Sequence, residues 1–272
     1  MTKTVQSWLD LIEELYRDSW DEEIGRHRST FAHRGVCDAR DSLTTRLIRT
    51  GRQLDPGREP PSTQQFETHI LRNFRKYGHA SAPVGESIWN WLALAQHHGL
   101  QTRLLDWTYS PFVAMHFVTE NLEAYDRDGV IWCMNYRESN RLLPEPLRQQ
   151  VEACGADVFS AEMLDQVCRS LEELEQLSEN EFVLFLEPPS LDVRIVNQFA
   201  LFSMMSRADS TLDQWLAQHS NIASKLIVPA KLKWEIRDKL DQAGITERLL
   251  YPGLDGTARW LSRYYLPRKG AE

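Results

Sequence analysis

The sequence lacks any run of about 18 apolar residues, the length that a membrane-spanning helix requires. It therefore predicts no transmembrane segment. The opening residues MTKTVQSWLDLIEELYRDSW also lack the basic-then-apolar pattern of a secretion signal, and their periodicity predicts an amphipathic helix instead. These absences favour a cytoplasmic protein.

Cysteine is scarce. The 272-residue chain has 4 cysteines, at positions 37, 133, 154 and 168, and none has CxxC spacing. This pattern argues against a disulfide framework and against a zinc site, and it suits a reducing environment. We therefore expect no metal in the functional site.

Basic residues are fewer than acidic ones, 31 against 39, which gives a net charge of −8. Such a protein is not coated with phosphate-binding groups. Its arginines are nevertheless concentrated near the N-terminus, at Arg26, Arg28, Arg34, Arg40, Arg46, Arg49, Arg52 and Arg58, whereas residues 157–187 are mostly acidic. This asymmetry indicates that the N-terminal third meets phosphates, with a solvated charged surface as the alternative.

Short helices and strands alternate along the chain. Helices are predicted at 1–24, near 45–50, from Gln64 after the loop LDPGREPPST, from Ser87 to Gly99 after the loop GHASAPVGES, and at 111–121, 143–180, 230–244 and 257–266. Strands are predicted at 29–36, 102–108, 128–136, 182–189, 194–204 and 225–229, and a strand followed by a turn at 245–256. The alternation, without repeats or a clear linker, predicts a single α+β domain with a mixed, short-stranded sheet flanked by helices.

Polar and aromatic residues crowd into LALAQHHGLQTRLLDWTYSPFVAMHF, residues 92–117. At about 100° per residue, His98 falls beside Trp91 on the apolar helix face and His97 points away, so the two rings should diverge. Period-two alternation puts Asp106 and Thr108 on one face of the following strand. Ser110 before Pro111 is a helix N-cap signal. A helix end, a strand edge and a helix start should thus form one pocket wall.

This block is the most specific part of a resemblance to the FRG domain family, named for an aromatic-Arg-Gly motif. The other blocks are HRG (33–35), LTTRLIR (43–49), DGVIW (128–132), RIVNQFALF (194–202) and LLYPGLDG (249–256). The resemblance implies an FRG domain at 29–268 after an N-terminal helical segment at 1–28. The chain departs from the family at His33, where an aromatic residue is usual, and at Phe199-Ala200, which replaces a glycine-containing turn.

The family's layout is in turn similar to the ADP-ribosyltransferase fold, with Arg34-Gly35, LLDWTYS and Ala114–Phe117 as corresponding parts. This similarity implies NAD as a substrate. It implies that Arg34, next to Gly35, clamps the pyrophosphate, with Arg103 as a second clamp. Thr108 and Ser110 would donate to ribose or phosphate, and Trp107 or Tyr109 would stack on nicotinamide.

The catalytic carboxylate is less clear from the resemblance. Aligning LDVRIVNQFALF with the strand that carries the catalytic glutamate puts Arg194 near that position, with Asp192 two residues earlier. Gln198 is polar but uncharged, and Asp106 is an alternative acid. Each candidate also has a structural interpretation. In this interpretation Asp106 forms an ion pair with Arg103 instead of acting as a catalyst, and Asp255 is a turn residue and helix cap.

Three functions follow as hypotheses. The first is an NAD-dependent ADP-ribosyltransferase that modifies a nucleobase or protein side chain, as a bacterial toxin or an antiviral (phage) defence effector. The second is a module that senses a nucleotide or nucleic acid through Arg34, Arg103 and Trp107 without turnover. The third is a hydrolase of phosphate or glycosidic bonds, with His98 and Asp106 as its acid–base pair.

Overall fold

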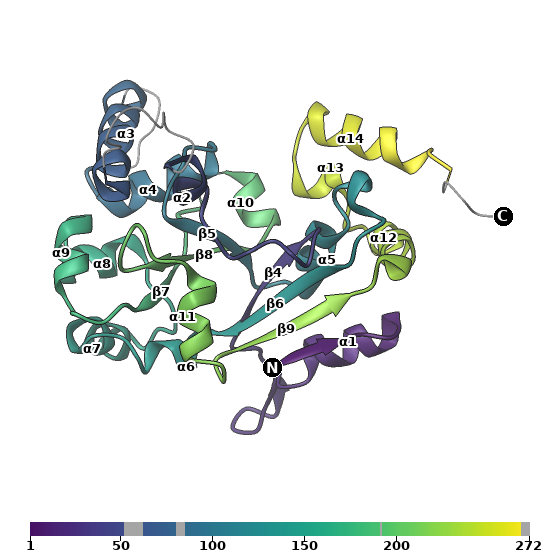
Figure 1. Ribbon diagram of the computed structural model, residues 1–272, viewed down its shortest axis with the longest axis horizontal. Coiled ribbons are helices and arrows are strands. Elements are labelled where there is room, and N and C mark those ends of the chain that lie inside the picture. The colour runs from purple at the N-terminus through teal and green to yellow at the C-terminus, as the bar shows by residue number, and fades with distance from the viewer. Residues whose placement is uncertain (52–61, 80–84, 191, 268–272) are drawn as a thin grey trace.

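A seven-stranded mixed sheet organises the molecule (Figure 1). The computed structural model describes residues 1–51, 62–79, 85–190 and 192–267. Strand order is β1-β9-β6-β4-β5-β8-β7, with β1 parallel to β9 and all other pairs antiparallel. The strands are β1 (Thr2–Thr4), β4 (Phe31–Val36), β5 (Leu104–Thr108), β6 (Gly129–Asn135), β7 (Val183–Leu186), β8 (Ala200–Met205) and β9 (Ala223–Val228). A small hairpin, β2 (Trp20–Asp21) and β3 (Arg26–His27), lies outside this sheet.

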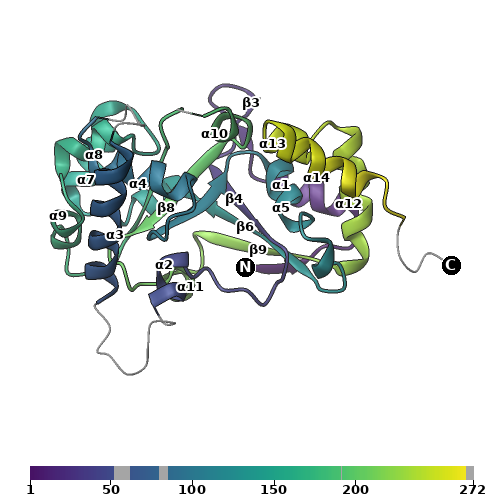
Figure 2. The same cartoon turned by 90° about the horizontal axis from the view of Figure 1, so that it is seen from above.

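Two groups of helices pack on separate parts of the sheet (Figures 1 and 2). The first group packs on β5, β8 and β7, around Leu104, Phe202 and Met204, and consists of α3 (Thr63–Gly78), α4 (Ile88–His97), α7 (Glu145–Cys154), α8 (Ala161–Val167) and α9 (Leu171–Gln176). The second group packs on β6 and β9, around Ile131 and Leu226, and consists of α1 (Trp8–Tyr16), α5 (Pro111–Val118) and α12 (Lys233–Gln242). The opposite face of the sheet packs on α11 (Leu212–Gln218).

Shorter helices complete the fold. α10 (Val193–Asn197) lies between the first group and the C-terminal pair α13 (Glu247–Leu250) and α14 (Leu254–Tyr264) in both views (Figures 1 and 2). The others are α2 (Arg46–Gly51), α6 (Tyr136–Asn140) and the 3₁₀ turns η1 (Leu122–Ala124) and η2 (Ala230–Leu232). None of the described helices is long and apolar enough to cross a membrane.

Local sequence signals explain several element boundaries. Ser62 and Gln65 form a capping box at the start of α3, satisfying backbone donors that the first turn leaves free. Ser110 Oγ accepts a hydrogen bond from Val113 N at 3.4 Å, and Pro111 occupies the first helical position, as predicted. Along β5, Leu104 packs with the first helix group, whereas Leu105 and Trp107 pack on the opposite face. The period-two prediction for this strand is confirmed.

The α+β prediction is confirmed, but three elements differ from their predictions. The N-terminal segment 1–24 contains strand β1 and helix α1 rather than one long helix. Residues 194–204 form helix α10 followed by β8, because Asp192 caps α10 through Arg194 N and only Ile195 of the helix is buried. Residues 245–256 contain α13, not a strand, and Asp255 lies in the first turn of α14, whose N-cap is Gly253. The predicted loop residues 54–61 and 80–84, with Arg52, Arg58 and the boundary at 268, lie outside the described residues.

Candidate functional site

A cavity of about 650 Å³ opens on the sheet face between the two helix groups. Its floor comes from β4, β5 and β8, and its rim from α2, the end of α4 and α10. The volume lies within the range of roughly 300–1,000 Å³ that small-molecule sites occupy. The cavity therefore suits a ligand of cofactor size.

The cavity lies where β4 and β5 separate. β4 pairs with β6 along all 6 of its residues but with β5 only at His33–Thr108. Arg34 follows this last pair and reaches toward β5, where its Nη1 donates to Asp106 O at 2.5 Å and lies 3.9 Å from Asp106 Oδ2. The predicted proximity of Arg34 and Asp106 is confirmed.

Positive charge dominates the cavity. Four arginines line it, Arg34, Arg46, Arg49 and Arg194, and Asp106 is the single acid among the described lining residues. Arg46 donates to Gly99 O at 3.1 Å and Arg49 to Thr44 O at 2.6 Å, so both bond backbone carbonyls, and neither forms an ion pair with a carboxylate of the described residues. Burial lowers the pKa of Arg34, which Asp106 raises and nearby Arg49 lowers. A site of this kind favours an anion, and guanidinium groups suit phosphate geometry.

Asp106 is held in one orientation by a short relay. Its side chain is 61% exposed, and Gln96 Nε2 donates to both carboxylate oxygens at 3.0 and 3.1 Å. Thr102 Oγ1 in turn donates to Gln96 Oε1 at 2.6 Å, which fixes which end of the amide faces Asp106. The carboxylate is therefore oriented yet open to a ligand.

His97 and His98 do not diverge as predicted. Their ring centroids are 5.1 Å apart, and both rings line the cavity. The His97 side chain is 10% exposed with Nε2 3.4 Å from Asp192 Oδ2, whereas His98 is exposed. The prediction is wrong because α4 ends at His97 and His98 has non-helical C-cap geometry, so the helical rotation per residue does not extend to it. Burial lowers the pKa of His97, although Asp192 raises it.

His33 is an almost completely buried polar group of the lining. It is 1% exposed, its Nδ1 lies 3.4 Å from Cys133 Sγ, and its Nε2 has no hydrogen-bond partner among the described residues. Burial lowers the pKa of His33 to about 4, so the ring is neutral at physiological pH. A neutral imidazole adds hydrogen-bonding capacity but no charge.

Arg103 is not a second phosphate clamp. Its side chain is 1% exposed and bonds Glu67 Oε2 at 2.7 Å, Ser206 O at 2.8 Å and, as an ion pair, Glu175 at 3.0 Å. Arg103 thus neutralises two carboxylates under α3 and α9, outside the cavity. A buried pair of this kind is structural, and removing either partner leaves a buried charge.

Trp107, Tyr109 and Ser110 do not provide the predicted ligand contacts. The Trp107 indole is 3% exposed, donates to Ser203 Oγ at 2.8 Å and packs on Phe185. Its ring faces are therefore buried and cannot stack on a ligand. The Tyr109 hydroxyl donates to Glu187 at 2.6 Å in a different hollow. Ser110 is occupied as the α5 cap. The sequence interpretation failed here because each side chain has a partner within the fold: Ser203 for Trp107, Glu187 for Tyr109 and the α5 backbone for Ser110.

Thr108 and Gly35 line the cavity as expected, but each has a structural role there. Thr108 Oγ1 donates to Gln198 O at 2.7 Å and is almost completely buried. At Gly35, a Cβ atom would lie 1.9 Å from Ala114 O, so β4 packs directly on the backbone of α5. The Arg-Gly pair is therefore explained by close packing beside Arg34.

Of the remaining predicted catalytic residues, Gln198 lines the main cavity and Asp192 lies in an adjoining one. Gln198 Nε2 donates to Leu250 O at 3.0 Å, which ties the end of α10 to α13. His98 and Asp106 both line the main cavity, but no hydrogen bond joins them among the described residues. The predicted hydrolytic pair is not assembled. The described residues also contain no cluster of His, Cys, Asp or Glu suited to a metal ion.

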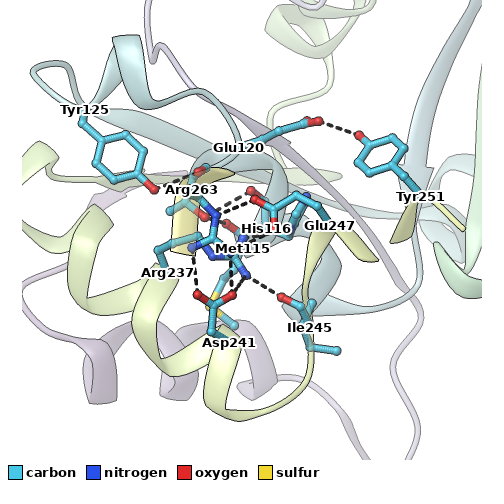
Figure 3. A network of polar contacts seen from close by, with 11 residues as sticks. Met115, His116, Glu120, Tyr125, Arg237, Asp241, Ile245, Glu247, Tyr251 and Arg263 are labelled. Carbon is cyan, nitrogen blue, oxygen red and sulfur yellow. Dashed lines mark hydrogen bonds and ion pairs between the residues drawn. The ribbon is translucent and has the colours of Figure 1, made fainter. Parts of the chain in front are cut away.

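A buried ionic network fixes the C-terminal helices that support α10 (Figure 3). Arg263 bonds Glu247 and Asp241, while Arg237 bonds His116 at 2.7 Å and also contacts Asp241. Burial opposes ionisation of Glu247, but hydrogen bonds and charge from Arg263 outweigh it and lower the pKa of Glu247 to about 2. The network thus joins α12, α13 and α14 to α5 and keeps the cavity rim in place.

Sequence reasoning assigned no site role to Gln96, His97 or Arg194, and named Arg46 and Arg49 only as part of an arginine-rich segment expected to meet phosphates. The arginine-rich N-terminal segment was the available signal for Arg46 and Arg49, and both lie at the cavity. Gln96 and Arg194 had no such signal, because their positions depend on where α4 and α10 end in space.

Comparison with known families identifies part of the chain. Residues 29–127 match the family model of the FRG domain, the family suggested by the sequence blocks. The matched region begins just before β4 and includes Arg34, Gln96, His97 and Asp106. No curated protein and no solved structure matches the chain.

Proposed function

We propose that this FRG-domain chain is an ADP-ribosyltransferase-like enzyme that binds NAD in the main cavity and transfers ADP-ribose to a macromolecule. The single observation that carries the proposal is that Arg34, Arg46 and Arg49 line one cavity together with one oriented carboxylate, Asp106. Modification of a cellular macromolecule would make the protein a toxin or defence effector. A ligand with a doubly charged pyrophosphate and a ribose matches this set of groups.

The arginines supply the phosphate clamp. Arg34 and Arg49 lie close enough for Arg49 to lower the pKa of Arg34, so their positive charges repel each other. A bound pyrophosphate relieves that repulsion and gains charge-assisted hydrogen bonds. Arg46, which stands at the rim on α2, extends the same positive surface.

Asp106 is the group proposed to act on the ribose. In the transfer, the bond between ribose C1′ and the nicotinamide nitrogen breaks, and nicotinamide leaves with the bonding electron pair. The acceptor's oxygen or nitrogen attacks C1′ and loses its proton to Asp106 or water. A carboxylate fixed by Gln96 next to the ribose hydroxyls stabilises the positive charge that develops at C1′.

The test measures turnover. Purified protein is incubated with NAD and cell extract, and nicotinamide release and labelled ADP-ribose transfer are measured. Asp106→Asn should lower the rate by about 100-fold or more and change NAD affinity little, because it removes one preorganised charge. Asp126→Asn is the matched control, since Asp126 is 73% exposed and pairs with Arg127 away from the cavity. Equal rates for wild type and Asp106→Asn, or none for wild type, would rule out the reaction.

A second candidate, nucleotide binding without turnover, is favoured by one observation. The segment aligned with a catalytic-glutamate strand is helix α10, so Asp106 is the single acid facing the cavity among the described residues. Calorimetry that detects NAD binding while the NAD concentration stays constant over hours would select this function.

A further inference from the structure

A second cavity adjoins the first. It has a volume of about 580 Å³ and shares His97, His98 and Arg194 with the main cavity. Its outer wall comes from Tyr251, between α13 and α14, and from Arg259 on α14. A ligand in the main cavity and a second ligand in this one would therefore meet at the same wall.

The wall of the second cavity carries guanidinium groups around an aromatic ring. Arg194 Cζ lies 4.9 Å and Arg259 Cζ 5.2 Å from the Tyr251 ring centroid. The Tyr251 hydroxyl donates to Glu120 at 2.6 Å, which anchors the ring (Figure 3). Neither arginine forms an ion pair with a carboxylate in the described part of the chain, and Arg194 Nε is buried without a hydrogen-bond partner.

Of the carboxylates in this cavity, Asp192 attracts the Arg194 guanidinium but forms no ion pair with it in the described part of the chain. Asp192 accepts from the Arg194 backbone N at 2.6 Å and lies beside His97. Asp255 lies in the first turn of α14, where the helix dipole stabilises it. Arg194 and Arg259 thus remain available for phosphate groups.

Phe199 supplies an exposed aromatic surface next to the main cavity, although its own side chain lines neither cavity. It lies between Gln198 and Ala200, which both line the main cavity, and it is 57% exposed. Its φ is 47°, a left-handed conformation that bulky residues avoid, and hydrogen bonds to Tyr109 N and Val196 O hold it there. Burial does not account for a strained, exposed phenylalanine, whereas a ligand that stacks on its ring does.

We propose that the second cavity and Phe199 bind a single strand of nucleic acid, so that a base of this strand is the acceptor for the transferase reaction. Arg194 and Arg259 contact the phosphates, and Phe199 stacks on an unpaired base. Alternating guanidinium and aromatic groups are how proteins bind single strands. The inference rests on the proposed function, because it names that reaction's acceptor.

Fluorescence anisotropy tests the binding directly. Labelled oligo-uridylate and oligo-deoxythymidylate are titrated with full-length protein over a series of salt concentrations. Loss of one phosphate contact in Arg259→Ala should reduce the slope of log affinity against log salt by about 0.7. Phe199→Ala should weaken binding by about fivefold or more and keep the slope, because it removes stacking and no charge.

Two further variants make the test specific. Arg248→Ala is the matched control, since Arg248 stacks on Trp260 at 4.8 Å and lines neither cavity. It should bind like wild type. Arg259→Lys keeps the charge and should retain the salt slope, which covers the case in which Arg259→Ala folds poorly. Far-ultraviolet circular dichroism checks the fold of each variant.

The outcomes separate this inference from the proposed function. Two results would overturn the nucleic-acid site. The first is an oligonucleotide affinity that is the same in wild type, Arg259→Ala and Phe199→Ala. The second is displacement of the oligonucleotide by polyglutamate at equal charge. NAD titration runs in parallel, where Arg34→Ala should lose NAD binding and keep oligonucleotide binding. Wild-type protein that binds the strand but not NAD would overturn the proposed transferase alone.

Discussion

The substitution Gly35→Ala should destabilise the protein severely, although it adds one methyl group. A Cβ at position 35 would lie 1.9 Å from Ala114 O, 2.9 Å from Ala114 C and 3.1 Å from Val118 Cγ2. Because the nearest atoms belong to the backbone of buried helix α5, a side-chain rotation cannot relieve the clash. β4 and α5 must separate by about 1.5 Å to bring this contact from 1.9 Å to the 3.4 Å at which ordinary contact begins.

Overpacking of a core typically costs 1–3 kcal/mol. We expect about 3 kcal/mol for Gly35→Ala, at the upper end, because two rigid elements must move and leave gaps around them. The separation would also displace Arg34, the preceding residue, from Asp106. NAD affinity should therefore fall along with stability.

Urea unfolding followed by tryptophan fluorescence and circular dichroism measures the effect. Gly155→Ala is the control, because Gly155 has φ 58° at the end of α7 and no atom near its added Cβ. That variant should cost about 1–2 kcal/mol from backbone strain alone. A Gly35→Ala protein as stable as the wild type, or more stable than Gly155→Ala, would refute the packing argument.

Three further changes test other parts of the structure. Arg103→Met should cost about 3–5 kcal/mol in urea unfolding, because it leaves Glu67 buried without its partner. Adding Glu67→Leu should recover only part of this loss, because Glu175 still lacks its partner and the Arg103 backbone N–H loses its acceptor; equal single and double variants would contradict this. His33 has a pKa of about 4, below the value of about 6.5 in the unfolded chain, so its contribution to stability is complete above pH 6.5 and is lost as pH falls toward 4. Between pH 6.5 and 4, His33→Gln should make the urea midpoint fall less steeply with pH than in the wild type. His116 contributes to the same fall, so some pH dependence should remain. An unchanged pH dependence in His33→Gln would exclude a contribution of His33. Phe199→Gly should raise stability by about 0.5–1 kcal/mol, since relief of a left-handed residue exceeds the entropy that glycine adds to the unfolded chain; a loss of stability would show that Phe199 is not strained.

Locally determined features could be predicted from the sequence. The Ser110-Pro111 helix start and the alternation along β5 depend on neighbouring residues, and both are found. Arg103 depends instead on Glu67, which lies 36 residues earlier in the chain, so its role in a buried pair had no local signal. Helix α10 was mistaken for strand because its β-branched residues favour strands unless a cap and an exposed position override them.

The same distinction applies to the site. Arg34 and Asp106 were assigned to one site through the resemblance to the ADP-ribosyltransferase fold, and they share the cavity. The glycine after Arg34 was assigned to ligand binding, whereas its contact with Ala114 arises only when β4 and α5 pack. The role of Gln96 depends on a hydrogen bond across the turn to Asp106, which spacing alone did not reveal.

Titration calorimetry of NAD against the Asp106→Asn protein tests the central claim most directly, because binding is measured with turnover suppressed. We predict saturable binding of one NAD per chain, weakened at least about tenfold when Arg34→Ala is added, since a charge-assisted phosphate contact is lost. Absence of NAD binding, or the same affinity with and without Arg34, would contradict the assignment of this cavity to a dinucleotide.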